Sequence, residues 1–577
     1  MKKLVALVLS LLLATSLLAG CASPSPTPDA GGEATAAPTQ GQSAEPTATD
    51  APPADGGKSI VINLGQEPPE MNTILTTSTG SMNVLRHIVD GLTILDQNDN
   101  PIPGVAESWD YDAETLTYTF HLRQGAAWND GSPVTAKDFV FAWDTFFTPE
   151  TGAEYAGTWA SLFLGASEKL NAAELSAENK ALLTALGYEG NVGWKAIDES
   201  TLQVTMAFPC QYFLSVLAFP STMPVPQAGY ETIGATAYGT EKENIMTNGA
   251  YTIADWVHES YMVLKKNPSY WDAANIDVEE IRIEMISDTN TAYNAFVSGE
   301  IDMIGLNAEQ SAQLTSEGKE VLHYDDGSAW YFEYNTAQKG LNNKKVRKAL
   351  TLAVDAELFI STVIKNSSTA AYSFVPPAIQ GGSFAEKVGK LYERIPTDGD
   401  YSAVKALFEE GLAEEGMTAA DLKFVIITDE GDTAAKNCAF FQEQWKTHLG
   451  LDVEIQQMTY QNRLERMTNK DFSVVMAGWG PDYNDPMTFL DLFVSGSGNN
   501  HTSYANTEYD ALVAQALFES DAAKRDEMLI AIEKIIAEDM PIGPIYNRRR
   551  DYITSDRLTG VVRTAFDDMN FRWAKVA

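Results

Sequence analysis

A cysteine near the N-terminus carries the clearest prediction of chemistry in this chain. Cys21 ends the tetrapeptide Leu-Ala-Gly-Cys at 18–21, where a cut before the cysteine would free the thiol that bacterial lipidation modifies. Lys2 and Lys3 and an apolar stretch over 4–18 come first, as in a secretory leader, and that stretch is too short to span a bilayer. We expect a lipoprotein signal over residues 1–20 and a lipid on Cys21. The alternative is an ordinary signal peptide and a freely secreted protein.

The remaining reactive residue types do not form a catalytic or metal-binding pattern. Six histidines occur without an HExxH motif, and His258-Glu259 lacks the second histidine of a zinc hydrolase site. Gly496-Ser497-Gly498 is interpreted as a flexible loop, since a nucleophile elbow needs the pattern G-x-S-x-G after a strand. The sequence therefore predicts no enzyme, no cofactor and no metal.

One segment resembles a calcium loop without meeting its requirements. Asp96, Asn98 and Asn100, with Glu107 further on, have the spacing of calcium ligands, but Pro101 stands where the loop requires glycine. We interpret this segment as a turn between strands.

The two cysteines in the body of the chain allow two interpretations. Cys210 and Cys438 could form a disulfide in an oxidising compartment. They are far apart in sequence and fall in segments assigned to different lobes, so two buried free thiols are favoured.

The charge balance argues against nucleic acid as a partner. The formal net charge is -39, and the densest basic run, 548–550 (Arg-Arg-Arg), is short and isolated. Phosphate backbones need clustered Lys and Arg. This run is predicted to lie on a strand or loop face, the alternative being an anion site.

Composition divides the chain into a tether and a large body. Residues 22–57 contain no aromatic or large aliphatic side chain, which predicts a disordered tether behind the lipidated cysteine, 21–57 in all. The 520 residues that follow are too many for one core, so two or three lobes are expected. No later apolar run is long enough for a transmembrane helix, and lipid is the expected membrane attachment.

Hydrophobic periodicity in the body predicts alternating strands and helices, and hence an α/β fold. The predicted strands are 60–64, 116–123, 204–208, 262–266, 281–286, 424–428, 453–457 and 473–477. The predicted helices are 82–95, one beginning at Thr135 with Asp138 in a capping box, 290–298, 343–354, 402–415, 435–448, 508–518 and 522–537.

Several segments together resemble the peptide- and oligopeptide-binding lipoproteins of bacterial ABC importers, solute-binding protein family 5. They are Pro-Gly-Val-Ala-Glu-Ser-Trp at 103–109, Thr-Asn-Gly-Ala-Tyr at 247–251, Ser-Gly-Glu-Ile-Asp at 298–302, Val-Arg-Lys-Ala-Leu at 346–350 and Ala-Gly-Trp-Gly-Pro-Asp-Tyr-Asn-Asp-Pro at 477–486. The resemblance covers nearly the whole body in the family's order.

The resemblance implies a periplasmic-binding-protein-like fold, with two large lobes and a smaller one joined by a hinge and the ligand in the cleft between them. Lobe I would comprise 58–92, 226–330 and 545–577, lobe II 93–225, and lobe III 331–544. Chain crossings near residues 330 and 545 would form the hinge. The implied function is capture of peptides and delivery to the permease and ATPase subunits of an importer, by a monomer.

The resemblance also implies where the ligand is held. Asp482 occupies the position whose acid pairs with the ligand's α-ammonium in the oligopeptide binders, the alternative being that it caps a turn. The stretch 477–482, which contains Gly478 and Gly480, would present a strand edge to the peptide backbone, and Pro481 fits an edge because it has no N–H.

Other positions complete the site that the resemblance implies. Trp479 and Tyr460 would line side-chain pockets, with core packing as the alternative for each, and Tyr483 is also expected among the ligand-binding residues. Ser81 and Asn83 lie where the first strand-to-helix loop faces the cleft, although related binders can carry an acid at the position of Ser81. Met476 stands where they can place a base for the ligand carboxylate. Arg466 or Arg463 could replace it, or each is a solvated helix residue.

Three alternative functions remain open from the sequence. The same fold binds nickel chelates, haem and oligosaccharides in other family members, although an acid at Asp482 suits a cationic amine. A surface peptidase would need a catalytic set that the sequence lacks. A receptor that senses peptides without importing them has the same sequence features.

Overall fold

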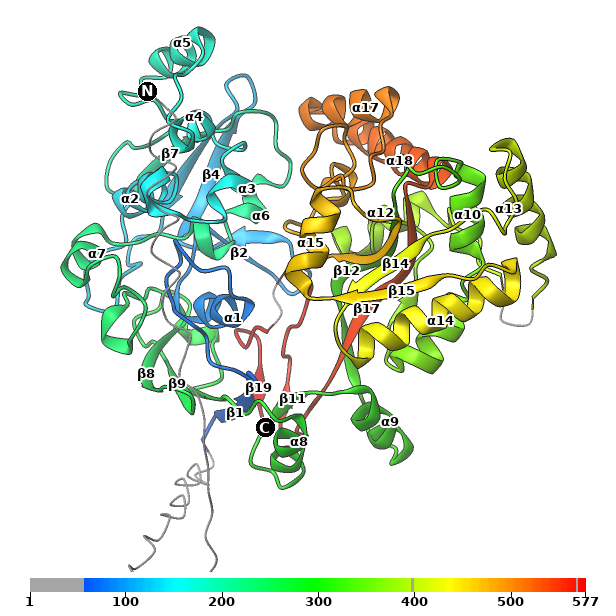
Figure 1. Cartoon of the computed structure of the whole chain (residues 1–577). Helices are drawn as coiled ribbons and strands as arrows, with labels where there is room; N and C mark the ends of the chain where they lie inside the picture. Colours follow the sequence, from blue (N-terminus) through cyan, green and yellow to red (C-terminus); the bar gives the residue numbers. More distant parts are fainter. Residues whose placement is uncertain (1–56, 396–398, 567–568) are drawn as a thin grey trace, which may run out of the picture. The chain divides into compact units, whose positions relative to one another are not determined.

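A mixed sheet of eleven strands runs through the protein in a computed structural model (Figure 1). The structure describes residues 57–395, 399–566 and 569–577. The predicted leader, Cys21 with its predicted lipid, and all but the last residue of the predicted tether lie outside the described residues. The described residues from 57 to 577 belong to one compact unit.

The large sheet has the strand order β15-β14-β16-β12-β17-β11-β1-β10-β9-β8, and β13 pairs with β17 off this path. Its strands are β1 (Ser59–Asn63), β8 (Tyr251–Val257), β9 (Tyr261–Lys266), β10 (Glu280–Glu284), β11 (Met303–Gly305), β12 (Leu322–Tyr334), β13 (Thr369–Ala370), β14 (Val425–Asp429), β15 (Glu454–Met458), β16 (Val474–Trp479) and β17 (Ile542–Thr554). A separate sheet, β4-β5-β7-β6, consists of β4 (Ala106–Asp112), β5 (Thr117–Leu122), β6 (Trp194–Ala196) and β7 (Thr201–Thr205). Two short pairs are β2 (Thr93–Leu95) with β3 (Pro101–Pro103) and β18 (Leu558–Thr559) with β19 (Lys575–Val576).

Helices connect these strands throughout the described chain. They are α1 (Thr79–Ile88), α2 (Ala136–Phe146), α3 (Ala156–Trp159), α4 (Ala166–Leu170), α5 (Ala177–Ala185), α6 (Phe213–Val216), α7 (Gln227–Ile233), α8 (Thr289–Val297), α9 (Ala308–Ser316), α10 (Lys344–Leu352), α11 (Ala356–Phe359), α12 (Ser383–Val388), α13 (Ser402–Glu414), α14 (Asp432–Leu449), α15 (Tyr460–Thr468), α16 (Met487–Leu490), α17 (Thr507–Phe518) and α18 (Ala522–Asp539).

The part of the large sheet that contains β12, β14 and β16 is buried on both faces. Successive side chains of a strand point to opposite faces. Phe332, Val474 and Met476 accordingly enter one core, which also contains side chains of α10, α13 and α14. Val475 and Ala477 enter a second core with side chains of α17 and α18. Helices on both faces explain why 473–477 is a continuous apolar run rather than an alternating one.

The strands β12 and β17 are 13 residues each and pair antiparallel along most of their length. A bulge interrupts the pairing, because Asp325 faces Arg549 and Ala329 faces Asn547, which leaves residues 326–328 opposite a single residue. Gly327 has φ +75° within this bulge, a conformation that glycine tolerates.

The arginine run 548–550 lies in β17, as predicted for a strand face, and acidic residues of β12 neutralise it. Arg549 Nε donates to Asp325 Oδ1 at 2.7 Å, and both Arg548 and Arg550 contact Asp326 Oδ2. The arginines therefore hold the two crossing strands together at the bulge.

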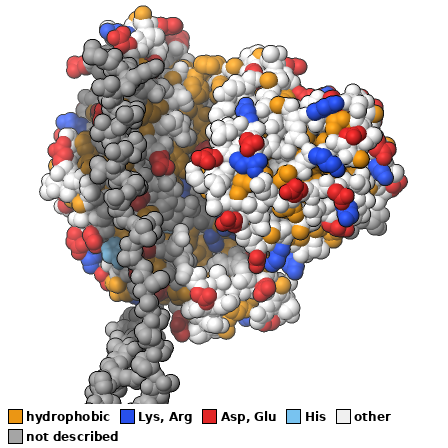
Figure 2. All heavy atoms as spheres, viewed as in Figure 1, with side chains coloured by type: hydrophobic (Ala, Val, Ile, Leu, Met, Phe, Trp, Pro, Cys, Tyr) orange, Lys and Arg blue, Asp and Glu red, His pale blue; other side chains and the backbone are white. Residues whose placement is uncertain are grey.

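Acidic and basic side chains are interspersed on the face that carries α10, α13 and α14 (Figure 2). Lys345 of α10, for example, lies 2.7 Å from Glu410 of α13. Such interleaving differs from the continuous basic surface that a nucleic acid requires.

Most of the predicted elements are confirmed to within a few residues. The capping box is present at α2, where the Thr135 N–H donates to Asp138 Oδ2 at 2.8 Å. The helix predicted over 82–95 is wrong in its second half, since α1 ends at Ile88 and the chain then turns extended into β2. A side chain at Gly91 would come within 2.4 Å of the Leu217 carbonyl oxygen, so this extended segment packs against another backbone where only glycine fits.

Other predictions were incomplete. The strand predicted at 204–208 is β7, which begins three residues earlier, at Thr201. The sequence analysis also missed several elements, among them β4, β8, α5, α7 and α9, and the two long strands β12 and β17, whose pairing is long-range.

The calcium-like segment is a turn between β2 and β3, as predicted. Asp96 Oδ1 accepts hydrogen bonds from the N–H groups of Asn98 and Asn100, at 2.8 and 2.9 Å. Cys210 and Cys438 are both buried and free, which agrees with the favoured interpretation. Among the residues that the structure describes, no helix is both long and apolar enough to cross a lipid bilayer.

Candidate functional site

A cavity of about 150 Å³ brings together segments that are far apart in the sequence. Its floor and walls come from α1, the residues around α6, the loop after β16 and the C-terminal segment. The lining residues are Thr79, Met82, Arg86, Leu95, Ser215, Val216, Ala218, Phe219, Pro481, Asp482, Tyr483, Asn484, Ala565 and Phe566.

Asp482 presents a carboxylate without a partner to this cavity. Its backbone N–H donates to Thr488 Oγ1 at 3.0 Å, which holds the loop, while no hydrogen bond or ion pair within the described chain reaches its side chain. Burial raises the pKa of Asp482 to about 6. A desolvated carboxylate of this kind gains more from a cationic partner than a solvated one does.

The neighbouring acid stabilises the turn instead. Asp485 Oδ1 accepts from the Met487 N–H at 2.9 Å, and its carboxylate forms a bidentate ion pair with Arg525 at 2.7 and 2.8 Å. Because Asp485 has this role, the turn does not depend on the side chain of Asp482.

Asp491 adds a second protonatable acid close to Asp482. Burial, and next the Asp482 carboxylate, raise the pKa of Asp491 to about 7. The two acids repel each other when both are ionised, so a cation placed beside Asp482 relieves this repulsion as well as the desolvation.

The strand that leads into the loop has one unpaired side. Antiparallel pairing of β16 with β12 extends from Val474 to Trp479, whereas parallel pairing with β14 includes only Val474 and Val475. Alternate backbone N–H and C=O groups point to opposite sides of a strand. From Met476 onward, half of these groups are therefore not used by the sheet.

Aromatic rings form the wall beside Asp482. Tyr483 stacks on Tyr212 with ring centroids 4.0 Å apart and planes 9° apart, and Trp159 meets it edge-on at 6.3 Å. Tyr212 belongs to the segment that carries α6, so this stack joins the loop after β16 to a distant part of the chain.

The glycines of the loop permit close packing. A side chain at Gly478 would lie 2.9 Å from ring atoms of Trp330 on the neighbouring strand, so only glycine fits there. At Gly480 the nearest such atom is Ser328 Oγ, at 3.6 Å. Trp479 packs against the second core and does not line the cavity, and the cavity lining likewise includes neither glycine.

Several residues that the resemblance placed in the site lie elsewhere. Ser81 and Asn83 are buried in α1, but the residues of that helix that line the cavity are Thr79, Met82 and Arg86. Tyr460 is 61% exposed at the start of α15. Met476 is buried in the first core.

The two arginines considered for a ligand carboxylate are already engaged. Arg463 Nε donates to Asp429 Oδ1 at 2.6 Å, and Arg466 donates to the Asp471 carbonyl and to Gln456 Oε1 at 2.8 and 2.9 Å. Both guanidinium groups are thus held by residues of β14, β15 and the loop after α15.

The sequence analysis missed Arg86 and Phe219 as residues that share the cavity with Asp482, and Tyr212 as the ring that stacks on Tyr483. Arg86 carried a usable signal, because it lies seven residues after Thr79 and four after Met82, on one face of a helix. Nothing in the sequence shows that this face meets the loop after β16.

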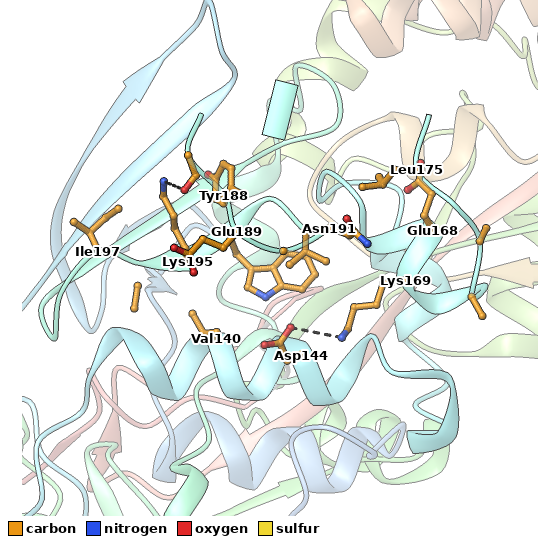
Figure 3. Close-up of a pocket in the computed structure, with 17 residues that line it drawn as sticks. Val140, Asp144, Glu168, Lys169, Leu175, Tyr188, Glu189, Asn191, Lys195 and Ile197 are labelled. Atoms are coloured by element: carbon orange, nitrogen blue, oxygen red, sulfur yellow. Dashed lines mark hydrogen bonds and ion pairs between the residues drawn. The ribbon is translucent and has the colours of Figure 1, made fainter. Parts of the chain in front are cut away.

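A larger hollow lies on the outside of the part of the chain that contains α2 and α4 (Figure 3). It is about 830 Å³ in volume, and none of its lining residues is shared with the cavity at Asp482. Its two lysines have partners: Lys169 Nζ lies 3.6 Å from Asp144, and Lys195 Nζ donates to the Leu186 and Gly187 carbonyls. The hollow therefore offers no free cation to a ligand carboxylate.

Comparison with known proteins identifies the family. Residues 100–501 match the family described as "Bacterial extracellular solute-binding proteins, family 5 Middle". The chain belongs to this family. It is also 30% identical over 523 residues to the dipeptide-binding protein DppE of Bacillus subtilis, covering 90% of this chain and 92% of the relative.

Further relatives of this family 5 protein agree with the assignment. The periplasmic oligopeptide-binding protein OppA of Salmonella typhimurium is 32% identical over 493 residues, 85% of this chain and 87% of the relative. The probable deoxycholate-binding periplasmic protein YgiS of Escherichia coli is 31% identical over 468 residues, 80% of this chain and 83% of the relative.

Solved structures share the fold. The structure of Haemophilus influenzae OppA in complex with the peptide RPPGFSPFR matches this family 5 protein with a TM-score of 0.69 and 28% identity, over 90% of this chain and 99% of that chain. The periplasmic-binding-protein-like fold is thereby confirmed. The protein is a solute-binding protein of the kind that serves peptide ABC importers, a family that acts outside the cytoplasm and consists of transport proteins rather than enzymes.

Proposed function

We propose that this protein captures peptides by pairing their α-ammonium group with Asp482 and delivers them to the permease and ATPase subunits of an ABC importer. The desolvated and unpartnered carboxylate of Asp482 is the observation that carries the proposal. Relatives named as dipeptide- and oligopeptide-binding proteins support a peptide as the ligand.

The unpaired side of β16 supplies the second half of the mechanism. A peptide in extended conformation adds to the free backbone groups from Met476 to Gly480, in the manner of strand addition. Backbone pairing does not involve the ligand's side chains, so the site accepts peptides of varied sequence. The ion pair between the ligand's ammonium group and Asp482 fixes the position of the peptide along the strand. The stacked rings of Tyr483 and Tyr212 close one wall of the site.

The remaining expectations from the sequence complete the proposal. Cys21 carries the lipid anchor, residues 21–57 are the tether, and the protein is a monomer. Lobe I comprises 58–92, 226–330 and 545–577, lobe II 93–225, and lobe III 331–544. The β12–β17 crossing, with its bulge and its arginine–aspartate contacts, is the hinge about which the lobes close.

Mass spectrometry of small molecules released by denaturing the purified protein tests the ligand class. A series of short peptides supports the proposal. A bile acid, sugar, haem or metal chelate would instead support the second candidate, a family 5 protein for a non-peptide solute, which the relative named for deoxycholate favours.

Calorimetry on ligand-stripped protein tests the role of Asp482. We expect Asp482→Ala to weaken binding of a peptide with a free amino terminus by about 3 to 5 kcal/mol, the usual cost of removing one partner of a buried pair. The matched control is Asp452→Ala, since Asp452 is 84% exposed on the surface. Equal affinity of the wild type and Asp482→Ala would refute the assignment.

A transport assay distinguishes a role in peptide import from a role in peptide sensing alone. Cells that lack this protein should lose uptake of a labelled peptide and regain it with the wild type but not with Asp482→Ala. A receptor that only senses peptides would leave uptake unchanged.

A further inference from the structure

Arg86 lies in the cavity without a partner for its charge. Thr79, Met82 and Arg86 occupy one face of α1, and that face lines the cavity. Arg86 is half-buried, with its Nε fully enclosed, and no hydrogen bond or ion pair within the described part of the chain reaches its guanidinium group. Guanidinium N–H groups taken out of water need acceptors, so this group is poised to receive one.

The nearest acid in the sequence cannot supply the acceptor, because other groups hold it. Asp90 follows Arg86 by four residues, but its carboxylate binds Arg572 at 2.8 Å. The Tyr270 hydroxyl and the Trp271 indole also donate to it, at 2.6 and 3.3 Å. The charge of Arg86 is therefore not neutralised by its own helix.

Asp482 lines the same cavity, and yet no ion pair joins it to Arg86 in the described structure. Both charges lie close enough to Tyr155 to influence its phenol. Burial raises the pKa of Tyr155, Asp482 raises this pKa further, and Arg86 lowers it. The cavity thus has an acidic and a basic group that face a common space and are separated by more than an ion-pair distance.

We propose that Arg86 binds a carboxylate of the ligand whose ammonium group pairs with Asp482. This inference rests on the proposed function. It makes the protein selective for ligands that carry an anionic group close to the amino terminus. A cavity of about 150 Å³ is comparable to one that holds benzene, so the two charges of the ligand must lie within about one or two residues of each other. The carboxylate comes either from the C-terminus of a dipeptide or from an acidic side chain near the amino terminus.

The other positions considered for binding the ligand carboxylate are not free to do so. Arg463 and Arg466 are engaged by Asp429 and Asp471, and Met476 is apolar and buried. Of the three arginines, Arg86 is the one that lines the cavity and has no ion pair within the described residues.

Calorimetry with four dipeptides separates the sources of the carboxylate. The probes are Ala-Ala, Ala-Ala-amide, Glu-Ala-amide and Gln-Ala-amide, titrated at pH 7.5 into the ligand-stripped protein. If the C-terminus supplies the carboxylate, Ala-Ala binds about 10- to 100-fold more tightly than Ala-Ala-amide. If a side chain supplies the carboxylate, Glu-Ala-amide binds more tightly than Gln-Ala-amide by a similar factor.

Substitution of Arg86 then tests whether this residue causes the preference for a ligand carboxylate. We expect Arg86→Gln to abolish the preference for the anionic ligand while leaving the affinity for Ala-Ala-amide unchanged, and Arg86→Lys to retain part of the preference. Arg282→Gln is the control, because it removes the same charge from β10, outside the cavity lining, where Arg282 pairs with Glu284. Circular dichroism confirms that each variant is folded.

The outcomes distinguish this inference from the function on which it rests. If peptides bind through a free amine but show no preference for a carboxylate, the role of Arg86 is wrong and that of Asp482 stands. The same holds if Arg86→Gln weakens all four ligands equally. If no dipeptide binds and longer peptides with free amines also fail, both proposals fall. Should Arg86→Gln not fold, the comparison of charged and amidated ligands on the wild type still decides whether a carboxylate is recognised.

Discussion

Replacing Asp482 by Asn should stabilise the ligand-free protein while removing its response to peptides. The substitution keeps the shape of the side chain and removes its charge. In the native protein, burial raises the pKa of this carboxyl from 3.8 to about 6, so at neutral pH the folded chain holds an ionised group in an unfavourable place. Such a cost is expected at a binding site, where the ligand supplies the missing partner.

The magnitude follows from the size of the pKa shift. One pKa unit corresponds to about 1.4 kcal/mol. The full shift of Asp482 would then amount to about 3 kcal/mol, and partial contact with solvent through the cavity lowers this to about 1 to 3 kcal/mol. For a body of about 520 residues, the usual entropy of unfolding converts this into a rise in Tm of about 1 to 3 °C.

The pH dependence provides the internal control. The folded state holds the proton of Asp482 more tightly than the unfolded chain does, so the contribution of Asp482 to the free energy of unfolding decreases as pH rises from about 4 to about 6 and then levels off. Asp482→Asn lacks this contribution, while other titrating groups such as Asp491 remain in both proteins. The two proteins should therefore have equal Tm values near pH 4, and the variant should be more stable at pH 7.5.

Differential scanning calorimetry on ligand-stripped proteins measures both quantities. A peptide that raises the Tm of the wild type should leave that of Asp482→Asn unchanged. A variant that is less stable than the wild type at pH 7.5, or one whose Tm difference is the same at both pH values, would refute the reasoning from desolvation.

Three further predictions concern binding and packing. The affinity for a peptide with a free amine should fall by up to tenfold per pH unit below pH 6, because Asp482, with a pKa of about 6, becomes protonated; calorimetry between pH 5 and 8 checks this. Gly478→Ala should lower the free energy of unfolding by about 1 to 3 kcal/mol, since the new Cβ would meet the Trp330 ring at 2.9 Å, and an unchanged Tm would contradict it. Arg525→Met should cost about 3 to 5 kcal/mol by leaving buried Asp485 unpaired, and the double variant with Asp485→Leu should recover most of this loss in the same thermal scan.

Local patterns predicted the elements that depend on neighbouring residues. The helix α18 is set by Asp521, which accepts from the Ala523 N–H at its start, and by its apolar spacing, and it lies within two residues of its predicted bounds. The strands β9, β10 and β16 were found from short apolar runs for the same reason. By contrast, β12 and β17 contain charged residues whose ion pairs form only when the strands meet, so neither has a clear periodic signal.

In the candidate site, too, some residues were predictable from the sequence and others were not. Asp482 was identified from the segment around it, because the resemblance is carried by consecutive residues. The sequence did not identify Arg86 or Tyr212 as parts of the site, nor the contacts of Arg466. Each of these depends on which surfaces pack together. Arg466, for example, was equally consistent with a ligand role and a solvated helix until its contacts with Asp471 and Gln456 were seen.

The sequence by itself determined the α/β class, the expected leader and tether, the family and the acid at 482, since these reside in composition, short-range periodicity and contiguous motifs. Only the tertiary structure decided that β16 keeps one side free, that Asp485 is used by Arg525 whereas Asp482 is not, and that Arg86 faces the same cavity. The physical reason is that charge pairing and desolvation depend on distances in space, and residues distant along the chain come within those distances only when the whole chain has folded.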